Sequence, residues 1–200
     1  MARLRKEQAE HTRERILAAA RKLFTEKGYF ATGTNEIVLA AGVGTRGALY
    51  HHFANKESLL LAVARELESE LAARIACALT GDRWSERLEQ ALHAFLDAST
   101  EPEVRRILLV DGPAAVGWGA WRESAARFGL RAIQQMLDAG CADGSLAVPN
   151  ATAMSYVLLA AVDAAALYVA HAPEPEVARA AAAAAIDRCL AGLRADAAAE

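Results

Sequence analysis

The chain has 200 residues, of which 54 % are hydrophobic and only 6 % aromatic, and its formal net charge is −3. This length is enough to bury a sizeable core in one or two small domains. Abundant alanine with few β-branched residues favours an all-helical protein and argues against a sheet fold. The small net charge does not by itself indicate a nucleic-acid partner.

The charge is unevenly distributed along the chain. Residues 1–58 contain ten Lys and Arg against six Asp and Glu, whereas residues 59–200 contain twelve against nineteen. A basic N-terminal part joined to an acidic remainder is the asymmetry expected of a nucleic-acid-binding protein.

The sequence predicts a cytoplasmic protein without a bound cofactor. The three cysteines are far apart and show no zinc-binding spacing, so we expect reduced thiols and no metal. The charged segment from Arg3 to Glu14 lacks the apolar core of a signal peptide. The longest apolar run, Tyr156–Ala170, is interrupted by Asp163 and reads as too short to span a bilayer.

The first predicted element is an amphipathic helix with Thr12 as its N-cap and Gly28 as the residue that ends it. Apolar residues recur at helical spacing from Ile16 to Phe24. Glycine after Lys27 is a typical helix C-terminus. Residues 1–11 are charged, and we expect either a frayed arm or an extra helical turn there.

The stretch Thr34–Phe53 predicts a helix, a tight turn and a short second helix. Gly42 suits the turn because glycine adopts positive φ at little cost. Thr45 is expected to cap the second helix through its hydroxyl. Leu49 and Phe53 are four residues apart, so they should pack inward and leave the other face free. A helix-turn-helix places such a second helix in the DNA major groove.

The motifs T-R-E-R-I-L, L-F-T-E-K-G-Y, E-I-V-L-A-A-G-V, R-G-A-L-Y-H-H-F and N-K-E-S-L-L occur in order between Thr12 and Val63. This segment resembles the DNA-binding domain of the tetracycline-repressor (TetR) family. The chain differs in one respect: four residues, not three, separate the turn valine from A-L-Y. The extra residue, assigned to Gly44, should lengthen the turn and shift the base contacts by one position.

The resemblance implies a helix-turn-helix domain over residues 1–55 and a helical effector-binding and dimerisation domain over residues 56–200. It implies an operator in double-stranded DNA as one partner and a homodimer as the assembly. The residues expected at DNA are Thr34, Gly44, Thr45, Arg46, Gly47, Ala48, Tyr50, His51, His52 and Lys56. Lys56, at the start of a helix capped by Asn55, is expected on a phosphate, although an ordinary surface lysine is the alternative.

The remaining chain predicts further helices, giving about nine in total. The helix that starts at Asn55 should run to Gly81 and act as a lever between the two domains. Later helices are expected from Asp82 or Ser85, from Glu101-Pro102-Glu103 to a break at Asp111-Gly112-Pro113, and then to Leu137. The last two are expected over Asn150–Ala170 and Pro175–Leu193.

The C-terminal part predicts a ligand pocket between helices, lined by aromatic side chains with a few polar groups. The effector should be small and hydrophobic or aromatic. Asp163 interrupts an apolar helix, so it either pairs within the protein or meets the ligand; the tryptophans are equally well explained as core. The candidate lining residues are Phe95, Asp111, Trp118, Trp121, Arg122, Phe128, Asp163 and Tyr168.

The last two helices are rich in alanine and carry more apolar surface than one chain can cover, as expected of a dimer interface. The candidate interface residues are Val157, Leu158, Ala161, Ala182, Ile186 and Leu190. No catalytic motif is present, so an enzyme is disfavoured. The sequence therefore predicts a one-component transcription regulator, most simply a repressor. The alternative is a ligand-binding dimer whose DNA binding is degenerate.

Overall fold

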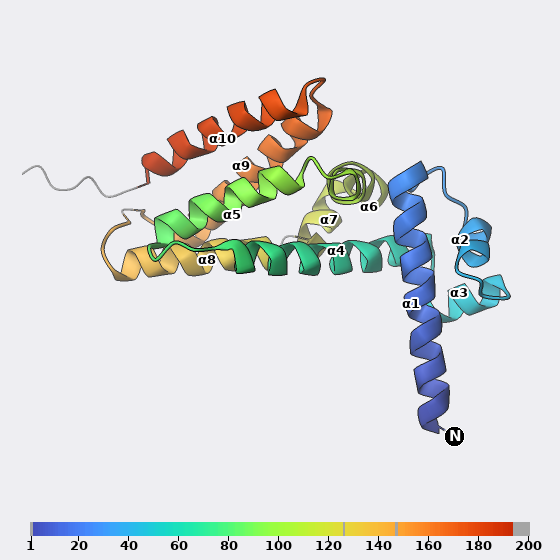
Figure 1. Ribbon diagram of the computed structural model, residues 1–200. Helices are drawn as coiled ribbons and strands as arrows, with labels where there is room; N and C mark the ends of the chain where they lie inside the picture. Colours follow the sequence, from blue (N-terminus) through green and yellow to red (C-terminus); the bar gives the residue numbers. More distant parts are fainter. Residues whose placement is uncertain (1, 126, 147, 194–200) are drawn as a thin grey trace, which may run out of the picture. The chain divides into compact units, whose positions relative to one another are not determined.

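The computed structural model describes residues 2–125, 127–146 and 148–193. Side chains are described for all of these except residues 2, 3, 5, 122–125, 127 and 128. Figure 1 shows the described chain as a succession of helices, which confirms the all-α fold class. The elements are α1 (Ala2–Lys27), α2 (Thr34–Ala40), α3 (Arg46–His52), α4 (Lys56–Ala78), α5 (Trp84–Ala98), η1 (Val104–Asp111), α6 (Gly112–Val116), α7 (Trp118–Ala125), α8 (Arg127–Ala142), α9 (Ala151–His171) and α10 (Pro175–Ala191).

The helices form two compact units. The first combines Met1–Leu67 with Pro102–Ser124, and the second combines Glu68–Glu101 with Ala125–Glu200. Helix α4 contributes residues to both units. The first unit thus contains the helix-turn-helix segment together with η1, α6 and most of α7, whereas a functional boundary at residue 55 stays a prediction.

Helix α1 begins at Ala2, well before the N-cap predicted at Thr12. Thr12 lies inside the helix, where its Oγ1 donates a hydrogen bond of 2.9 Å to the Gln8 carbonyl. A threonine within a helix satisfies its hydroxyl in this way, four residues back along the chain. The preceding residues include strong helix formers such as Glu, Gln and Ala, so the helix extends through them. Its predicted end is confirmed, since Gly28 has φ +91°.

The first unit has a continuous apolar core under α1, α2, α3 and the start of α4. These side chains come from the apolar positions recognised in the sequence. Burying them supplies the main favourable free energy of this unit, at roughly 25 cal/mol per Å² of apolar surface. The fully buried larger members are Ile16, Leu17, Phe24, Ile37, Leu49, Leu59, Leu60 and Val63.

The predicted helix break at Asp111-Gly112-Pro113 is wrong. Residues Val104–Asp111 form a π-helix, η1, and α6 follows at Gly112 without an intervening loop. Pro113 has no N–H to donate, and it lies where the helix changes from π to α, in the first turn of α6. Gly112 itself keeps helical dihedral angles, φ −60° and ψ −58°.

The second unit is built on α5, α8, α9 and α10, which lie side by side (Figure 1). Two ion pairs join α5 to α10: His93 Nε2 lies 2.6 Å from Asp187 Oδ1, and Arg179 Nε lies 2.6 Å from Asp97 Oδ1. Asn150 caps α9 as predicted, its Oδ1 accepting a 2.8 Å bond from the Ala153 N–H.

Helix α9 agrees with the helix predicted over Asn150–Ala170 and is longer than the apolar run Tyr156–Ala170 within it. Its 21 residues, Ala151–His171, are long and apolar enough to cross a membrane by length and composition alone. About two fifths of its apolar window, 39 %, is buried inside the protein. Because α9 packs against α5, α8 and α10, the composition fits a helix in a helical bundle equally well.

A close contact between α5 and α8 gives a test of this packing. A Cβ added to Gly140 would lie 2.5 Å from the Trp84 ring, and that ring is held by a hydrogen bond from Nε1 to Ser145 Oγ. Gly140→Ala should therefore lower the free energy of unfolding by about 1–3 kcal/mol through overpacking. Thermal unfolding followed by circular dichroism measures the loss.

Gly119→Ala is the matched control, because its Cβ would meet nothing within 4 Å. Alanine there should leave the stability unchanged or raise it slightly, since alanine is the better helix former. Equal unfolding temperatures for the two variants would contradict the packing described for Gly140.

Candidate nucleic-acid interface

The helix-turn-helix consists of α2, a five-residue turn and α3, all within the first unit. Gly42 has φ +62°, the left-handed conformation predicted for the turn. The Arg15 guanidinium of α1 lies on this glycine, with Nη2 2.5 Å from the position that a Cβ would take. Val43 is buried behind the turn. The turn is therefore fixed by backbone conformation and by an arginine that sequence reasoning did not identify.

Helix α3 is a short helix with one buried side. Its N-cap is Thr45, as predicted, whose Oγ1 accepts a hydrogen bond of 3.4 Å from the Ala48 N–H. Leu49 and Phe53 are buried, again as predicted. Arg13 of α1 lies over the outer side of the Phe53 ring, 5.4 Å from its centroid. The helix is thus attached to α1 along one side only.

The opposite side of α3 is open and carries donor groups and rings. Thr45, Arg46, Gly47, Tyr50 and His51 are exposed, and Ala48 and His52 are half-buried. Arg46 Nη2 donates hydrogen bonds of 3.4 Å to Tyr50 Oη and to Thr34 Oγ1 of α2. Hydrogen bonding by Arg46 is the main cause that lowers the pKa of Tyr50 below its ordinary value.

Two histidines close the C-terminal end of this open side. The His51 and His52 rings meet edge to face with centroids 5.1 Å apart. Partial burial, followed by repulsion from His51 and Arg13, lowers the pKa of His52 below its ordinary value. His52 is therefore largely uncharged at neutral pH and can act as a hydrogen-bonding group.

The extra residue Gly44 lies in open space. A Cβ there would meet nothing within 4 Å, and its φ is not positive. The turn accommodates the additional residue on its exposed side, before the cap at Thr45. Nothing in the packing around Gly44 requires glycine.

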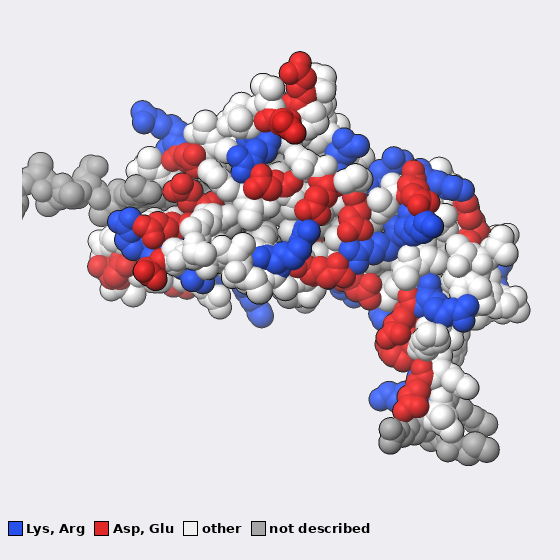
Figure 2. Space-filling model, viewed as in Figure 1, with Lys and Arg blue, Asp and Glu red and all other residues white. Residues whose placement is uncertain are grey.

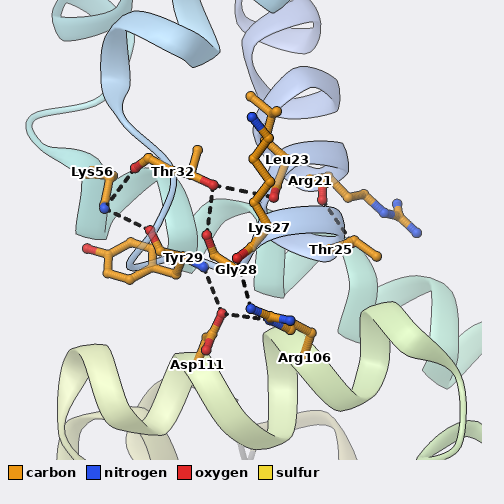
Figure 3. A network of polar contacts seen from close by, with 10 residues as sticks. All are labelled: Arg21, Leu23, Thr25, Lys27, Gly28, Tyr29, Thr32, Lys56, Arg106 and Asp111. Carbon is orange, nitrogen blue, oxygen red and sulfur yellow. Dashed lines mark hydrogen bonds and ion pairs between the residues drawn. The ribbon is translucent and has the colours of Figure 1, made fainter.

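Lys56, which the sequence predicts on a phosphate, makes contacts within the protein, and the phosphate contact stays a prediction. Its Nζ donates hydrogen bonds of 2.8 Å to the Tyr29 carbonyl and 3.0 Å to the Thr32 carbonyl (Figure 3). The ammonium also lies 4.1 Å from the centroid of the Tyr29 ring. Burial lowers the pKa of Lys56 below the usual lysine value. Its first role is to hold the turn between α1 and α2, and a phosphate contact is left to its remaining donor.

The charge on the visible face does not form a separate basic field. Figure 2 shows Lys and Arg interspersed with Asp and Glu across this face. Several of the ion pairs belong to α1 and its surroundings, such as Lys27 with Glu36 and Arg21 with Glu103. The basic excess of residues 1–58 is therefore partly neutralised locally.

Comparison with known proteins supports what this geometry indicates. Residues 16–63 match the family model described as bacterial regulatory proteins, tetR family, and residues 85–193 match a tetracyclin repressor-like C-terminal domain. The second match alone covers more than half of the chain. The chain belongs to the TetR family.

Individual relatives agree with this assignment. A TetR-family transcriptional regulator from Pectobacterium atrosepticum has 32 % sequence identity and a TM-score of 0.83, covering 95 % of this chain and 97 % of that chain. RolR, solved in complex with resorcinol, shares the fold with a TM-score of 0.74 at 23 % identity, covering 92 % and 89 %. The regulator AcrR from Shigella flexneri is 39 % identical over 112 residues, which is 54 % of this chain and 51 % of AcrR. The chain spans about half or less of the curated relatives that it matches first.

The ligand candidates of this TetR-family chain are distributed over both units. Asp111, Trp118 and Trp121 belong to the first unit, and Phe95, Asp163 and Tyr168 to the second. Asp163 is half-buried and engaged in an interaction of its own. The side chains of Arg122 and Phe128 lie outside the described residues. Their assembly into one ligand site stays a prediction.

Two of these candidates have structural roles that the sequence did not indicate. The Asp111 carboxylate is buried and accepts a hydrogen bond of 2.7 Å from the Tyr29 N–H. Trp121 is buried against Gly112, whose added Cβ would lie 2.2 Å from the ring. A ligand contact by Asp111 stays a prediction. Trp118 is about half exposed.

Four of the predicted interface residues are buried within the chain itself. Leu158, Ala182, Ile186 and Leu190 pack inward, because α9 and α10 contact each other and α5. Their assignment to a subunit surface is therefore corrected. Ala161 is half-buried and Val157 is exposed. The exposed sides of the two helices carry Tyr156, Val157, Ala160, Ala164 and Tyr168 on α9, and Val177, Ala180, Ala181 and Ala184 on α10.

The two glycines of the turn provide a matched pair of substitutions. Gly42→Ala places a side chain at φ +62° and against Arg15, so it should lower the free energy of unfolding by about 1–3 kcal/mol. Gly44→Ala should leave the stability within about 0.5 kcal/mol, as for an ordinary surface change. Thermal or urea unfolding of both variants measures the difference. A loss at Gly44 as large as that at Gly42 would refute the described turn.

Proposed function

We propose that this protein is a cytoplasmic, homodimeric, one-component regulator that binds a palindromic DNA operator through α3. It acts as a repressor and is released from DNA by a small hydrophobic or aromatic effector. The observation that carries the proposal is the open side of α3. A capped helix with a buried apolar side presents Arg46, Tyr50 and His51 outward together.

The chemistry of this surface suits the DNA major groove. The Arg46 guanidinium offers a fork of donors that fits either guanine O6 and N7 or a phosphate. Thr45, Tyr50 and the two histidines add hydroxyl and imidazole groups for bases or phosphates. Arg46 is already oriented by Tyr50 and Thr34, which reduces the rotamer freedom lost on binding. Affinity should fall steeply with salt, because counterions are released from DNA.

A dimer is supported by the exposed sides of α9 and α10. Tyr156, Val157, Tyr168 and Val177 are each more than half exposed, although all four are apolar or aromatic. Alanines between them allow close approach of a second helix pair. Large apolar side chains exposed together are typical of a protein contact. A two-fold dimer places two α3 helices about one DNA turn apart, roughly 34 Å, to match the half-sites of a palindrome.

The effector is proposed from the accessible aromatic side chains. Trp118 is exposed and Phe95 and Tyr168 are accessible, so aromatic surface is available to a ligand in each unit. RolR, solved with resorcinol, illustrates that this fold can hold a small aromatic molecule. An effector changes operator affinity only by its differential affinity for the two conformations.

Replacing Arg46 and Tyr50 together by alanine should abolish specific DNA binding. The duplex is selected from a random-sequence library by the wild-type protein, and binding is measured by fluorescence anisotropy at fixed salt. The loss should exceed about tenfold, because each base contact contributes about 1–3 kcal/mol. Circular dichroism should be unchanged, since both side chains are exposed.

Arg131→Ala is the control, because it removes one exposed arginine from α8 in the second unit. It should bind the selected duplex like the wild type. Retained affinity in the Arg46→Ala, Tyr50→Ala protein, with Arg131→Ala equally tight, would exclude α3 as the DNA-reading element.

Charges on the exposed sides of α9 and α10 should produce monomers. Tyr156→Arg with Val177→Arg places a cation on each proposed contact surface without disturbing the buried sides. Light scattering at micromolar concentration should show half the wild-type mass, and operator affinity should fall with it. Gln135→Arg, on an exposed position of α8, should remain dimeric. A wild-type protein that is itself monomeric would refute the assembly.

A further inference from the structure

The turn between α1 and α2 is held by three charged side chains from other elements, all within the first unit. Arg106 Nη2 donates a hydrogen bond of 2.9 Å to the Lys27 carbonyl, and Asp111 Oδ2 accepts one of 2.7 Å from the Tyr29 N–H (Figure 3). Lys56 Nζ donates hydrogen bonds to the Tyr29 and Thr32 carbonyls. We call Lys56, Arg106 and Asp111 the charged clamp. The N–H and the C=O of Tyr29 are thus each hydrogen-bonded by a charged side chain.

Two members of the clamp come from η1, and their spacing is unusual for one helix face. Arg106 and Asp111 are five residues apart. In an α-helix, residues five apart point about 140° away from each other. A π-helix closes its hydrogen bonds between residues i and i+5, so a turn takes more residues and brings such a pair back together. Arg106 Nε lies 3.4 Å from Asp111 Oδ2, which shows that they share a face.

The start of η1 is attached to α1 by a third contact. Glu103, the N-cap residue of η1, accepts hydrogen bonds of 2.8 Å and 2.7 Å from the Arg21 guanidinium. Glu103 and Arg106 are three residues apart, a spacing that an α-helix also places on one face. A change of η1 from π to α would therefore preserve these two contacts with α1. It would turn Asp111 away from the Tyr29 N–H.

Arg106 and Asp111 are both tightly packed against neighbouring residues. Arg106 lies so close to Gly28 that an added Cβ would be 2.2 Å from Nη2. At the other end, Gly112 follows Asp111 directly and is packed under the Trp121 ring. The Trp121 ring of α7 thus contacts the residue that directly follows Asp111.

We propose that Arg106, Asp111 and Lys56 are positioning residues for the helix-turn-helix. The π register of η1 is then the conformational feature that decides whether α2 is held on α1. In the π register the Tyr29 peptide is bound on both sides and α2 is held on α1. In the α register the Tyr29 N–H loses its carboxylate and the turn is released. The consequence for operator binding rests on the proposed function; the consequence for the Tyr29 amide does not.

Asp111→Ala tests the clamp directly. Full-length protein labelled with ¹⁵N-tyrosine has only four tyrosine amides, and Tyr29→Phe assigns the one of interest. In Asp111→Ala the Tyr29 amide resonance should move and its hydrogen exchange should become faster. Affinity for the selected duplex should fall roughly 5- to 150-fold, the range of allosteric coupling. Asp111→Asn keeps an acceptor oxygen and should restore most of both readings.

Asp97→Ala is the matched control, because it breaks an Arg–Asp pair of the same type between α5 and α10 in the second unit. It should leave the Tyr29 amide and the operator affinity unchanged, whatever its effect on the unfolding temperature. An unshifted Tyr29 amide in Asp111→Ala, or an equal loss of operator affinity in Asp97→Ala, would overturn the clamp. If the wild type selects no duplex, the proposed function fails while the Tyr29 amide still decides the clamp.

A pair of single-residue deletions tests the register. Removing Val110 leaves Arg106 and the aspartate four apart, which an α-helix places on one face, so the Tyr29 amide should stay bound. Removing the exposed Arg105 shortens η1 equally and keeps the spacing of five, so the Tyr29 amide should be released. This deletion also brings Glu103 and Arg106 two apart, and Glu103→Ala, which removes only the Arg21 contact, should leave the Tyr29 amide bound. The same chemical shift and hydrogen-exchange rate of the Tyr29 amide in both folded deletion proteins would overturn the role of the register. If either deletion prevents folding, the Asp111 substitutions decide the proposal.

Discussion

The arrangement of the helix-turn-helix depends on how the main-chain N–H and C=O groups are hydrogen-bonded where α1 ends. A helix C-terminus leaves carbonyls without partners, and the chain that follows must pair its own N–H and C=O groups before it can be buried. Here Lys56 and Arg106 supply donors to carbonyls and Asp111 supplies an acceptor to the Tyr29 N–H. Charged groups make stronger hydrogen bonds than neutral ones. The path from α1 into α2 is therefore fixed by side chains that lie 24 to 82 residues away in the sequence.

The features that the sequence predicted correctly are local ones. Thr45 and Asn150 cap helices through bonds three residues along the chain, and Gly28 and Gly42 adopt positive φ at the predicted turns. The buried side of α3 followed from a four-residue spacing. Each of these depends on a few neighbouring residues, so a pattern in one segment is sufficient to identify it. The family motifs added the function of the segment, which periodicity alone does not give.

The features that the sequence did not predict depend on contacts between distant segments. Asp111 reads as a polar residue at a helix break, and only the packing of η1 against α1 gives it the Tyr29 N–H. Ile186 reads as a dimer contact because α10 alone cannot show which of its sides meets α5. Thr12 resembles a helix cap, yet its hydroxyl is satisfied equally well inside a helix. In each case the residue type permits two environments, and tertiary structure decides between them.

Helix α3 has only seven residues, too few to persist in water on its own, since isolated helices shorter than about 12–15 residues are marginal. Its helical conformation is stabilised by Leu49 and Phe53, which pack in the core, and by the turn before Thr45. The geometry of the exposed side of α3 therefore depends on the stability of the small core beneath it. Loss-of-function substitutions should then be found as often among the buried residues that support α3 as on its exposed side.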